Sequence, residues 1–282
     1  MCLAWCVILC CTISGMALRF VTPPRSLTRL IGRALADFRM IREGDRVLLG
    51  LSGGKDSLTL LHVLEHFRRH APVRFELGAA TVDPQSPDFD PRPLVPYLES
   101  LGIPYHLCSE PIVALAREKM RNDSFCAFCA RMKRGILYGA ARRHGYNVLA
   151  LGQHLDDLAE SFLMSAFHEG RLQTMKAHYR IDAGDLRVIR PMVYVRERQT
   201  AAFAAEAGLP VIYENCPACF AKPTQRQHMK MLLAREERSN PQLFKSLLST
   251  MRPLMERGLA EAVPQQRPKH PAASREVRRV RD

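Results

Sequence analysis

The sequence predicts an α/β protein built on a doubly wound parallel sheet with C-terminal helices. Short apolar runs, typical of buried strands, alternate with segments in which apolar residues recur at helical spacing. One such run ends in a glycine-rich turn that opens a leucine-rich helix, as strand–turn–helix units of these sheets do. The composition, with 47% hydrophobic and 24% charged residues among 282, suits one large globular domain.

The first half of the chain alternates helix and strand. Apolar residues at helical spacing predict a helix over 27–40, and Gly44-Asp45 turns the chain into an apolar strand over 46–51. The leucine pattern after the glycine-rich turn predicts a helix over 58–67. Further apolar runs, separated by a Pro-rich loop, predict a strand over 74–82, a helix over 94–101 and a strand over 105–107.

The second half continues the alternation and ends in helices. Helical spacing predicts a helix over 129–144, and an apolar run predicts a buried strand over 148–152. Residues 170–187 are expected to be irregular, and 209–213 to form the last strand. The remaining helices are expected over 156–167, 196–207, 224–238 and 241–257.

Both ends of the chain are expected to lie outside the main domain. Residues 1–25 are predicted to be a poorly ordered extension, because their apolar part has no Lys or Arg before Arg19, unlike a signal peptide, and is short for a membrane span. A poor signal peptide and a membrane-proximal helix are the alternatives. The domain is expected over 26–261, followed by a disordered basic tail over 262–282. We therefore expect no membrane partner and a cytoplasmic protein.

The turn over 52–57, Ser-Gly-Gly-Lys-Asp-Ser, has the composition of a phosphate cradle. Its glycines let the backbone approach an anion, and the next helix presents free N–H groups and the positive end of its dipole. It is not a Walker A motif, which needs glycine in place of Leu49 and Ser or Thr in place of Asp56. The turn therefore predicts ATP cleavage to AMP and pyrophosphate. The candidate ATP- and pyrophosphate-binding residues are Ser52, Gly53, Gly54, Lys55, Asp56, Ser57 and Asp83.

Carboxylates follow the predicted strands. Asp56 can contact magnesium or orient the loop, and Asp83 can contact the nucleotide or form a plain Asp-Pro turn. Asp156 and Asp157 can hold magnesium or orient a nucleophile, with helix capping as the alternative. Because ligands bind beyond the carboxyl ends of parallel strands, one crevice is expected to collect these groups.

Nine cysteines include two C-x-x-C pairs, Cys126/Cys129 and Cys216/Cys219, which suit a soft metal. Four thiolates can make a structural zinc site, and three can hold an iron–sulfur cluster with one open iron. A redox disulfide is a third alternative. From the residues alone, zinc is the default expectation.

The charge of the chain favours a polyanionic partner, nucleic acid first. The formal net charge is +13 at pH 7, for which general solubility is the alternative explanation. The helix that follows the first cysteine pair is rich in cations, which can hold an RNA backbone or form a solvated face. The candidate RNA-binding residues are Arg131, Arg134, Arg142 and Arg143.

Taken together, these motifs resemble the TtcA-type tRNA 2-thiocytidine synthetases, among the TtcA/TtuA thiolases of the PP-loop ATP pyrophosphatase superfamily. The resemblance covers about 26–261 and implies an adenine nucleotide alpha hydrolase-like fold. The stretches that carry it are Gly44-Asp45-Arg46, Ser52-Gly53-Gly54-Lys55-Asp56-Ser57, Tyr97-Leu98-Glu99-Ser100-Leu101-Gly102, Cys126-Ala127-Phe128-Cys129 with Arg134-Gly135-Ile136-Leu137-Tyr138, Leu151-Gly152-Gln153-His154 with Asp156-Asp157, Ile189-Arg190-Pro191, Arg196-Glu197, and Cys216-Pro217-Ala218-Cys219 with Gln225-Arg226-Gln227.

The resemblance implies a tRNA-cytidine 2-sulfurtransferase. ATP adenylates the C2 oxygen of a tRNA cytidine, with position 32 as the expected target, and sulfur then displaces AMP. The implied cofactors are ATP, Mg²⁺ and a 4Fe-4S cluster, which replaces zinc as the expectation. The implied partners are tRNA and a sulfur donor, either a cysteine desulfurase or sulfide, while a homodimer is an open alternative. The implied residues are the catalytic Lys133 with Asp156 or Asp157, and the cluster ligands Cys126, Cys129 and Cys216, with Cys219 as a substitute for Cys216.

Departures from the family pattern leave the RNA target open. Gln153 stands where the family usually has His, and Phe220-Ala221-Lys222 also differs. The alternatives are a PP-loop ligase or amidotransferase, which needs no C-x-x-C pairs, and a thiolase for another base with structural zinc. An RNA-binding module without catalysis is disfavoured by the intact loop. A zinc deaminase is excluded because none of the ten His residues begins His-x-Glu.

Overall fold

The computed structural model describes residues 20–119, 125–212 and 224–256. Most of the predicted extension and the whole basic tail lie outside these ranges. Phe20 and Val21, by contrast, pack onto the domain, where the Val21 backbone lies within hydrogen-bond distance of Nδ1 of His62. Within the described ranges, no helix is long and apolar enough to cross a membrane.

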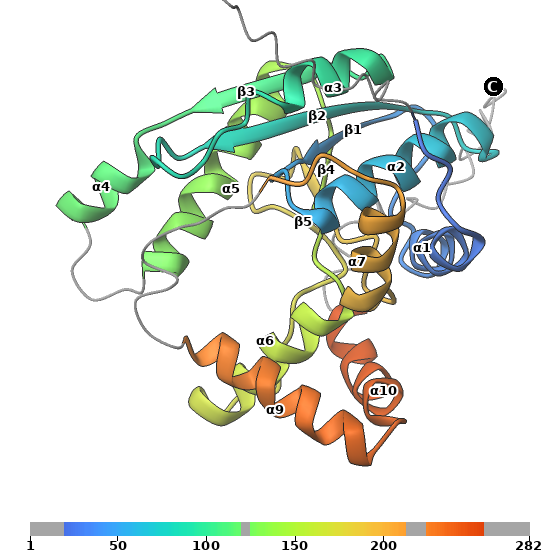
Figure 1. Cartoon of the computed structure of the whole chain (residues 1–282), viewed down its shortest axis with the longest axis vertical. Helices are drawn as coiled ribbons and strands as arrows, with labels where there is room; N and C mark the ends of the chain where they lie inside the picture. Colours follow the sequence, from blue (N-terminus) through green and yellow to red (C-terminus); the bar gives the residue numbers. More distant parts are fainter. Residues whose placement is uncertain (1–19, 120–124, 213–223, 257–282) are drawn as a thin grey trace, which may run out of the picture.

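A six-stranded sheet lies at the centre, in the order β3-β2-β1-β4-β6-β5 (Figure 1). All neighbouring strands pair in parallel except β5, which is antiparallel to β6. The chain moves outward from β1 to β3 and then returns to the other side of β1 at β4, which creates a topological switch point between β1 and β4. The strands are β1 (Asp45–Gly50), β2 (Phe75–Asp83), β3 (Tyr105–Ser109), β4 (Val148–Ala150), β5 (His178–Arg180) and β6 (Arg187–Ile189).

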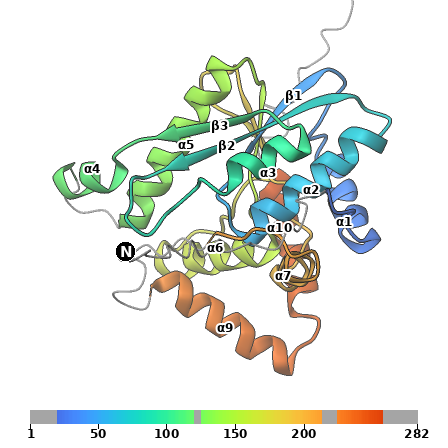
Figure 2. The ribbon, with the colours of Figure 1, turned by 45° about the horizontal axis from the view of Figure 1, so that its top comes forward.

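Helices cover both faces of this sheet, as a doubly wound fold requires. Because side chains alternate along a strand, Val47 and Leu49 of β1 join one core and Leu48 joins the other. The first core includes α1, α2, α3 and α7, and the second includes α4 and α5 (Figure 2). These helices are α1 (Arg25–Asp37), α2 (Lys55–His70), α3 (Leu94–Leu101), α4 (Ile112–Lys119), α5 (Phe125–Arg143) and α7 (Glu197–Glu206).

The expected C-terminal helices are present as a separate layer. They are α9 (Gln225–Ser239) and α10 (Leu243–Glu256), and both contact α6 (Leu155–His168), below the sheet in the view of Figure 1. Leu233 of α9 and Met251 of α10 are buried in the first core. The layer therefore contacts the helix that follows the β4 turn.

Several expected elements differ in the structure. The segment predicted to be irregular holds β5 and the first residue of β6, whose three-residue strands are too short to show a period. The strand predicted over 209–213 does not form in its described part, because the Ile212 N–H donates to the Gly53 carbonyl instead of joining the sheet. Helix α4 was not predicted. Helix α5 begins at Phe125, so the first cysteine pair lies inside a helix and not in the loop before it.

Candidate active site

The predicted phosphate cradle forms at the carboxyl end of β1. Gly53 has a φ of 83°, which disfavours any residue with a side chain, and an added Cβ would lie 3.1 Å from Ile212. The N-cap of α2 is Gly54, which makes no side-chain capping hydrogen bond. Gly54 therefore leaves the first-turn N–H groups of α2 without a side-chain cap. An anion site at a helix N-terminus requires such N–H groups.

The turn after β4 packs directly against this cradle. A Cβ on Gly152 would lie 3.4 Å from the backbone nitrogen of Ser57. The two turns on either side of the switch point therefore lie side by side, as the sequence predicts.

A cavity of about 480 Å³ opens at this point. Its apolar part includes Ala80, Val82 and Phe89, which can pack against a flat ring such as a nucleobase. Its polar part carries a surplus of positive charge, with four cationic and two anionic lining residues. The charged or hydroxyl-bearing residues that line it are Ser52, Asp56, Ser57, Lys133, Arg134, Asp157, Arg190 and Arg226.

Asp156 and Asp157 are adjacent in the sequence, but their side chains make different contacts, and only Asp157 lines the large cavity. Asp157 lines the large cavity, its carboxylate accepts the His154 N–H (2.9 Å), and it forms an ion pair with Arg226 (3.2 Å). Asp156 instead accepts the Nε–H of Arg196, which is shared between its two carboxylate oxygens (3.1 and 3.2 Å), and the Glu197 N–H (2.7 Å). Asp157 also completes a capping box with His154, so the predicted capping role accompanies its place in the cavity.

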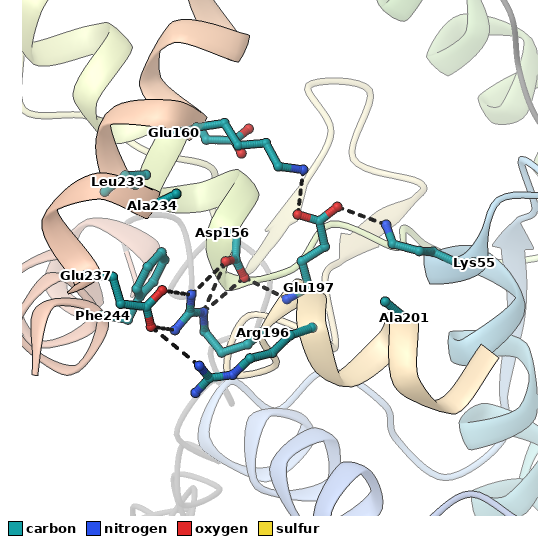
Figure 3. Close-up of a pocket in the computed structure, with 12 residues that line it drawn as sticks. Lys55, Asp156, Glu160, Arg196, Glu197, Ala201, Leu233, Ala234, Glu237 and Phe244 are labelled. Atoms are coloured by element: carbon teal, nitrogen blue, oxygen red, sulfur yellow. Dashed lines mark hydrogen bonds and ion pairs between the residues drawn. The ribbon is translucent and has the colours of Figure 1, made fainter. Parts of the chain in front are cut away.

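Lys55 and Asp56, although adjacent in the sequence, also line different cavities. Asp56 lines the large cavity and accepts hydrogen bonds from the Thr200 hydroxyl and from Nζ of Lys55 (2.9 Å). Lys55 lines a second cavity of about 310 Å³ and donates to Glu197 (3.0 Å), which also pairs with Lys230 of α9 (2.6 Å) (Figure 3). In this geometry the Lys55 ammonium is held by protein carboxylates.

Titration behaviour reflects this network. Burial raises the pKa of Glu197, but its ion pairs with Lys230 and Lys55 outweigh burial and bring the pKa to about 2. Burial lowers the pKa of Lys55, but Asp56 and Glu197 leave it raised. Both groups are therefore charged over the physiological range.

The second cavity is lined by ion pairs between α2, α6, α7 and α9, and one of its residues, Glu160, pairs with Arg226 of the large cavity. Arg196 bridges Asp156 and Glu237 (2.6 Å), and its guanidinium lies 3.2 Å from the centre of the Phe244 ring (Figure 3). Four cationic and four anionic residues line this cavity, and each has an oppositely charged partner. These residues are Lys55, Asp156, Glu160, Arg196, Glu197, Arg198, Lys230 and Glu237.

The predicted metal ligands are only partly described. Cys129 is half-buried and is not in a disulfide, and it lies one helical turn before Lys133, which lines the large cavity. Cys126 lies three residues earlier on α5, and residues three apart share a helix face. A soft thiol at Cys129, one turn from a residue of the large cavity, suits a sulfur-ligated centre. The Cys126 side chain, Cys216 and Cys219 lie outside the described part, in which no group of three metal-binding side chains occurs.

The remaining predicted residues divide between the cavity and the surface. Arg134 lines the cavity, whereas Arg142 pairs with Asp185 (2.6 Å) near the other end of α5. Arg131 and Arg143 are both exposed. Asp83 accepts the Gln85 N–H (2.8 Å), which is the turn geometry expected of an Asp-Pro pair.

Sequence reasoning did not assign roles to Arg190, Gln153 and Arg226 in the cavity, or to Glu197 beside it. Arg190 follows the end of β6, so its place at the carboxyl edge was a usable signal once that strand was known. Arg226 and Glu197 lie in two stretches that resemble the family, Gln225-Arg226-Gln227 and Arg196-Glu197. Nothing in those stretches indicates that packing brings the two side chains to the cavities.

Residues 25–214 match the model of the PP-loop domain family. The chain is 45% identical over 228 residues to a tRNA-cytidine(32) 2-sulfurtransferase of Geobacter sulfurreducens, covering 80% of this chain and 89% of the relative. It is 43% identical over 238 residues to the enzyme of the same name from Geobacter metallireducens, covering 84% and 93%. The chain belongs to the tRNA-cytidine(32) 2-sulfurtransferase family.

The fold of this 2-sulfurtransferase family member also matches a solved structure. The U34-tRNA thiolase NcsA from Methanococcus maripaludis, solved with its 4Fe-4S cluster, superposes with a TM-score of 0.68 at 21% identity. The match covers 82% of this chain and 78% of that one. The predicted PP-loop fold is confirmed, and the site residues that lie in it remain predictions.

Proposed function

We propose that the protein replaces the C2 oxygen of cytidine 32 in tRNA with sulfur, at the cost of one ATP converted to AMP and pyrophosphate. The observation that carries this proposal is the composition of one cavity. It joins a phosphate cradle, an apolar wall, a surplus of positive charge and Lys133, one turn from Cys129. ATP and an RNA strand are both polyanions, and the cavity offers charge to both.

The reaction has two substitutions. The C2 oxygen of the base first attacks the α-phosphorus of ATP, so that an oxygen–phosphorus bond forms and the bond to pyrophosphate breaks. A sulfur nucleophile then attacks C2, and the carbon–oxygen bond breaks to release AMP. When bound at Cys126, Cys129 and Cys216, or Cys219 in its place, a 4Fe-4S cluster would hold the sulfur atom that the donor provides.

The residues of the chain bind, orient and move protons. Backbone N–H groups from Gly53 to Ser57 bind the pyrophosphate part, as helix N-termini bind anions. Lys133 places a positive charge where negative charge develops in the transition state. Asp157, which lines the cavity where Asp156 does not, is the acid–base group that the geometry favours.

Magnesium fits the same cavity. The carboxylates of Asp56 and Asp157 and the hydroxyls of Ser52 and Ser57 are hard oxygen donors, which Mg²⁺ prefers together with phosphate oxygens. Asp83 stays a proposed nucleotide contact, although its carboxylate already holds a turn. A cysteine desulfurase or free sulfide completes the reaction as sulfur donor, and a homodimer acting in the cytoplasm is the proposed setting.

The test is anaerobic purification, followed by an absorption spectrum, iron and sulfide analysis, and incubation with ATP, a sulfide source and unmodified tRNA. We expect an iron–sulfur spectrum and 2-thiocytidine in the digested tRNA. Cys126→Ala should abolish both, whereas the matched control Cys108→Ala, on the edge strand β3, should keep both. A colourless protein with one zinc, or normal thiolation by Cys126→Ala, would contradict the proposal.

A further inference from the structure

Two buried arginines lie at the two ends of strand β6, and only one of them has a carboxylate partner among the described residues. Arg187 opens the strand and Arg190 follows its end, and each is 5% exposed. The Arg187 guanidinium forms an ion pair with the carboxylate of Asp45. Arg187 thus has the counter-ion that a buried cation needs.

Arg190 has neutral partners instead. Its Nε donates to the side-chain oxygen of Gln153 (3.1 Å), its Nη1 donates to the Lys176 carbonyl (2.6 Å), and its guanidinium lies 5.6 Å from the centre of the Tyr179 ring. Among the residues that the structure describes, no carboxylate forms an ion pair with it. Burial lowers the pKa of Arg190, as expected for a charge removed from water, but arginine stays protonated in proteins.

The position of Arg190 indicates which anion it serves. It lines the large cavity together with Ser52 and Ser57 of the phosphate cradle. Two strand spacings, about 10 Å, separate β1 from β6 at the sheet edge, so Arg190 lies on the side of the cradle opposite the apolar wall of Ala80 and Val82. A nucleotide with its base on that wall and its phosphates at the cradle would have its phosphate end toward the side on which Arg190 lies.

We propose that Arg190 is a further substrate-binding residue that takes a phosphate group of the reacting complex. A guanidinium binds phosphate through two parallel N–H···O bonds, and two neutral acceptors hold this one in a fixed orientation without neutralising it. This inference rests on the proposed function. Two sources share the phosphate chemistry, the nucleotide and the tRNA backbone, and binding experiments separate them.

The experiment measures binding to the cluster-loaded protein in two arms, one with a non-hydrolysable ATP analogue alone and one with unmodified tRNA alone. Arg190→Met should weaken binding about 10- to 100-fold in one arm, and that arm identifies the source. Arg190→Lys, which keeps the charge but loses the fork, should recover part of the loss. Affinities of Arg190→Met within twofold of wild type in both arms overturn the proposal.

If Arg190→Met does not fold, the proposal is tested with two other variants, Gln153→Glu for ligand binding and Arg187→Met for stability. Gln153→Glu places a carboxylate beside the guanidinium and should supply an internal counter-ion, so it should weaken the same arm. Unchanged binding by Gln153→Glu in both arms would also overturn the proposal. Arg187→Met removes the buried ion-pair partner of Asp45, so it should lower stability more than Arg190→Met, and the reverse order counts against the proposal.

Failure here is distinguishable from failure of the proposed function. The two binding arms need no sulfur transfer, whereas the proposed function is tested by 2-thiocytidine formation by the wild-type protein. A wild-type protein that thiolates tRNA while Arg190→Met binds both ligands normally refutes only the role of Arg190.

Discussion

Two neighbouring cavities share the start of α2, and they handle charge in opposite ways. In the smaller cavity four cations face four anions, and each charge has an opposite partner. In the larger one four cations face two anions. A balanced set of ion pairs fastens helices to one another, whereas a surplus of one sign attracts a ligand. The difference distinguishes residues whose ion pairs hold the helices together from residues that face the space for a ligand.

Two adjacent pairs in the sequence are divided between these cavities. Asp56 and Asp157 face the larger cavity, while Lys55 and Asp156 face the smaller one. Neighbouring positions on a helix point about 100° apart, so one member of each pair meets the ligand side and the other meets protein. This comparison places Asp157 at the larger cavity and Asp156 in the paired network, which is the basis for proposing Asp157 as the acid–base group.

The largest expected effect comes from exchanging the two aspartates for asparagine. Asp157→Asn should lower kcat about 100- to 10,000-fold, because it removes the proposed acid–base group, with a stability loss of only about 1 kcal/mol from the capping box. Asp156→Asn should lower the free energy of unfolding by about 3 kcal/mol, because Arg196 loses a buried partner, while kcat of the folded protein changes little. Single-turnover thiolation measures kcat, and urea unfolding measures the free energy of unfolding. A large loss of kcat in Asp156→Asn together with little change of kcat in Asp157→Asn would contradict the comparison.

A smaller effect is expected at the centre of the paired network. Glu197→Gln leaves two lysines without their shared carboxylate, so the free energy of unfolding should fall by about 1–3 kcal/mol. The control is Glu76→Gln, whose partner is Arg46 at an exposed site, and it should cost less than about 0.5 kcal/mol. Equal losses in the two variants would mean that the network contributes no more than a surface pair.

The same carboxylate predicts a pH dependence. Because the folded-state pKa of Glu197 is lowered to about 2, its stabilisation is fully present above the unfolded pKa, near 4.5, and is lost as pH falls toward 2. The stability difference between wild type and Glu197→Gln should therefore shrink below about pH 4.5. The comparison between variants is needed because His62 and His178, whose burial lowers each pKa to about 4, destabilise both proteins as pH falls below 6.5.

The smallest effect on stability is expected among the arginines of α5. Arg142 pairs with Asp185 at an exposed site, so Arg142→Ala should leave the free energy of unfolding unchanged within experimental error. If the cavity side of α5 meets tRNA, Arg134→Ala should weaken binding more than Arg142→Ala and reduce the salt slope by about 1. Fluorescence titrations at several salt concentrations decide this, and equal effects would extend the RNA surface along the whole helix.

Much of the fold was predictable because its signals are local. The glycine-rich turn, the apolar strands and the amphipathic helices lie within short stretches, and the structure contains them with ends shifted by a few residues. The three-residue strands β5 and β6 were missed because they show no periodicity, and they form only by pairing with each other and with β4. The position of the cysteine pair inside α5 was likewise missed, because the helix begins before its apolar pattern does.

The sequence by itself determined the phosphate cradle, the cysteine pairs and the family, because each depends on residue types at fixed spacing. Only the tertiary structure decided that Asp157 rather than Asp156 faces the cavity and that Lys55 is held by Glu197. It alone placed Arg190, buried and without a carboxylate partner in the described part of the chain, beside the cradle. These outcomes depend on partners from 14 to 142 residues away in the chain, whose meeting is set by packing and not by local pattern.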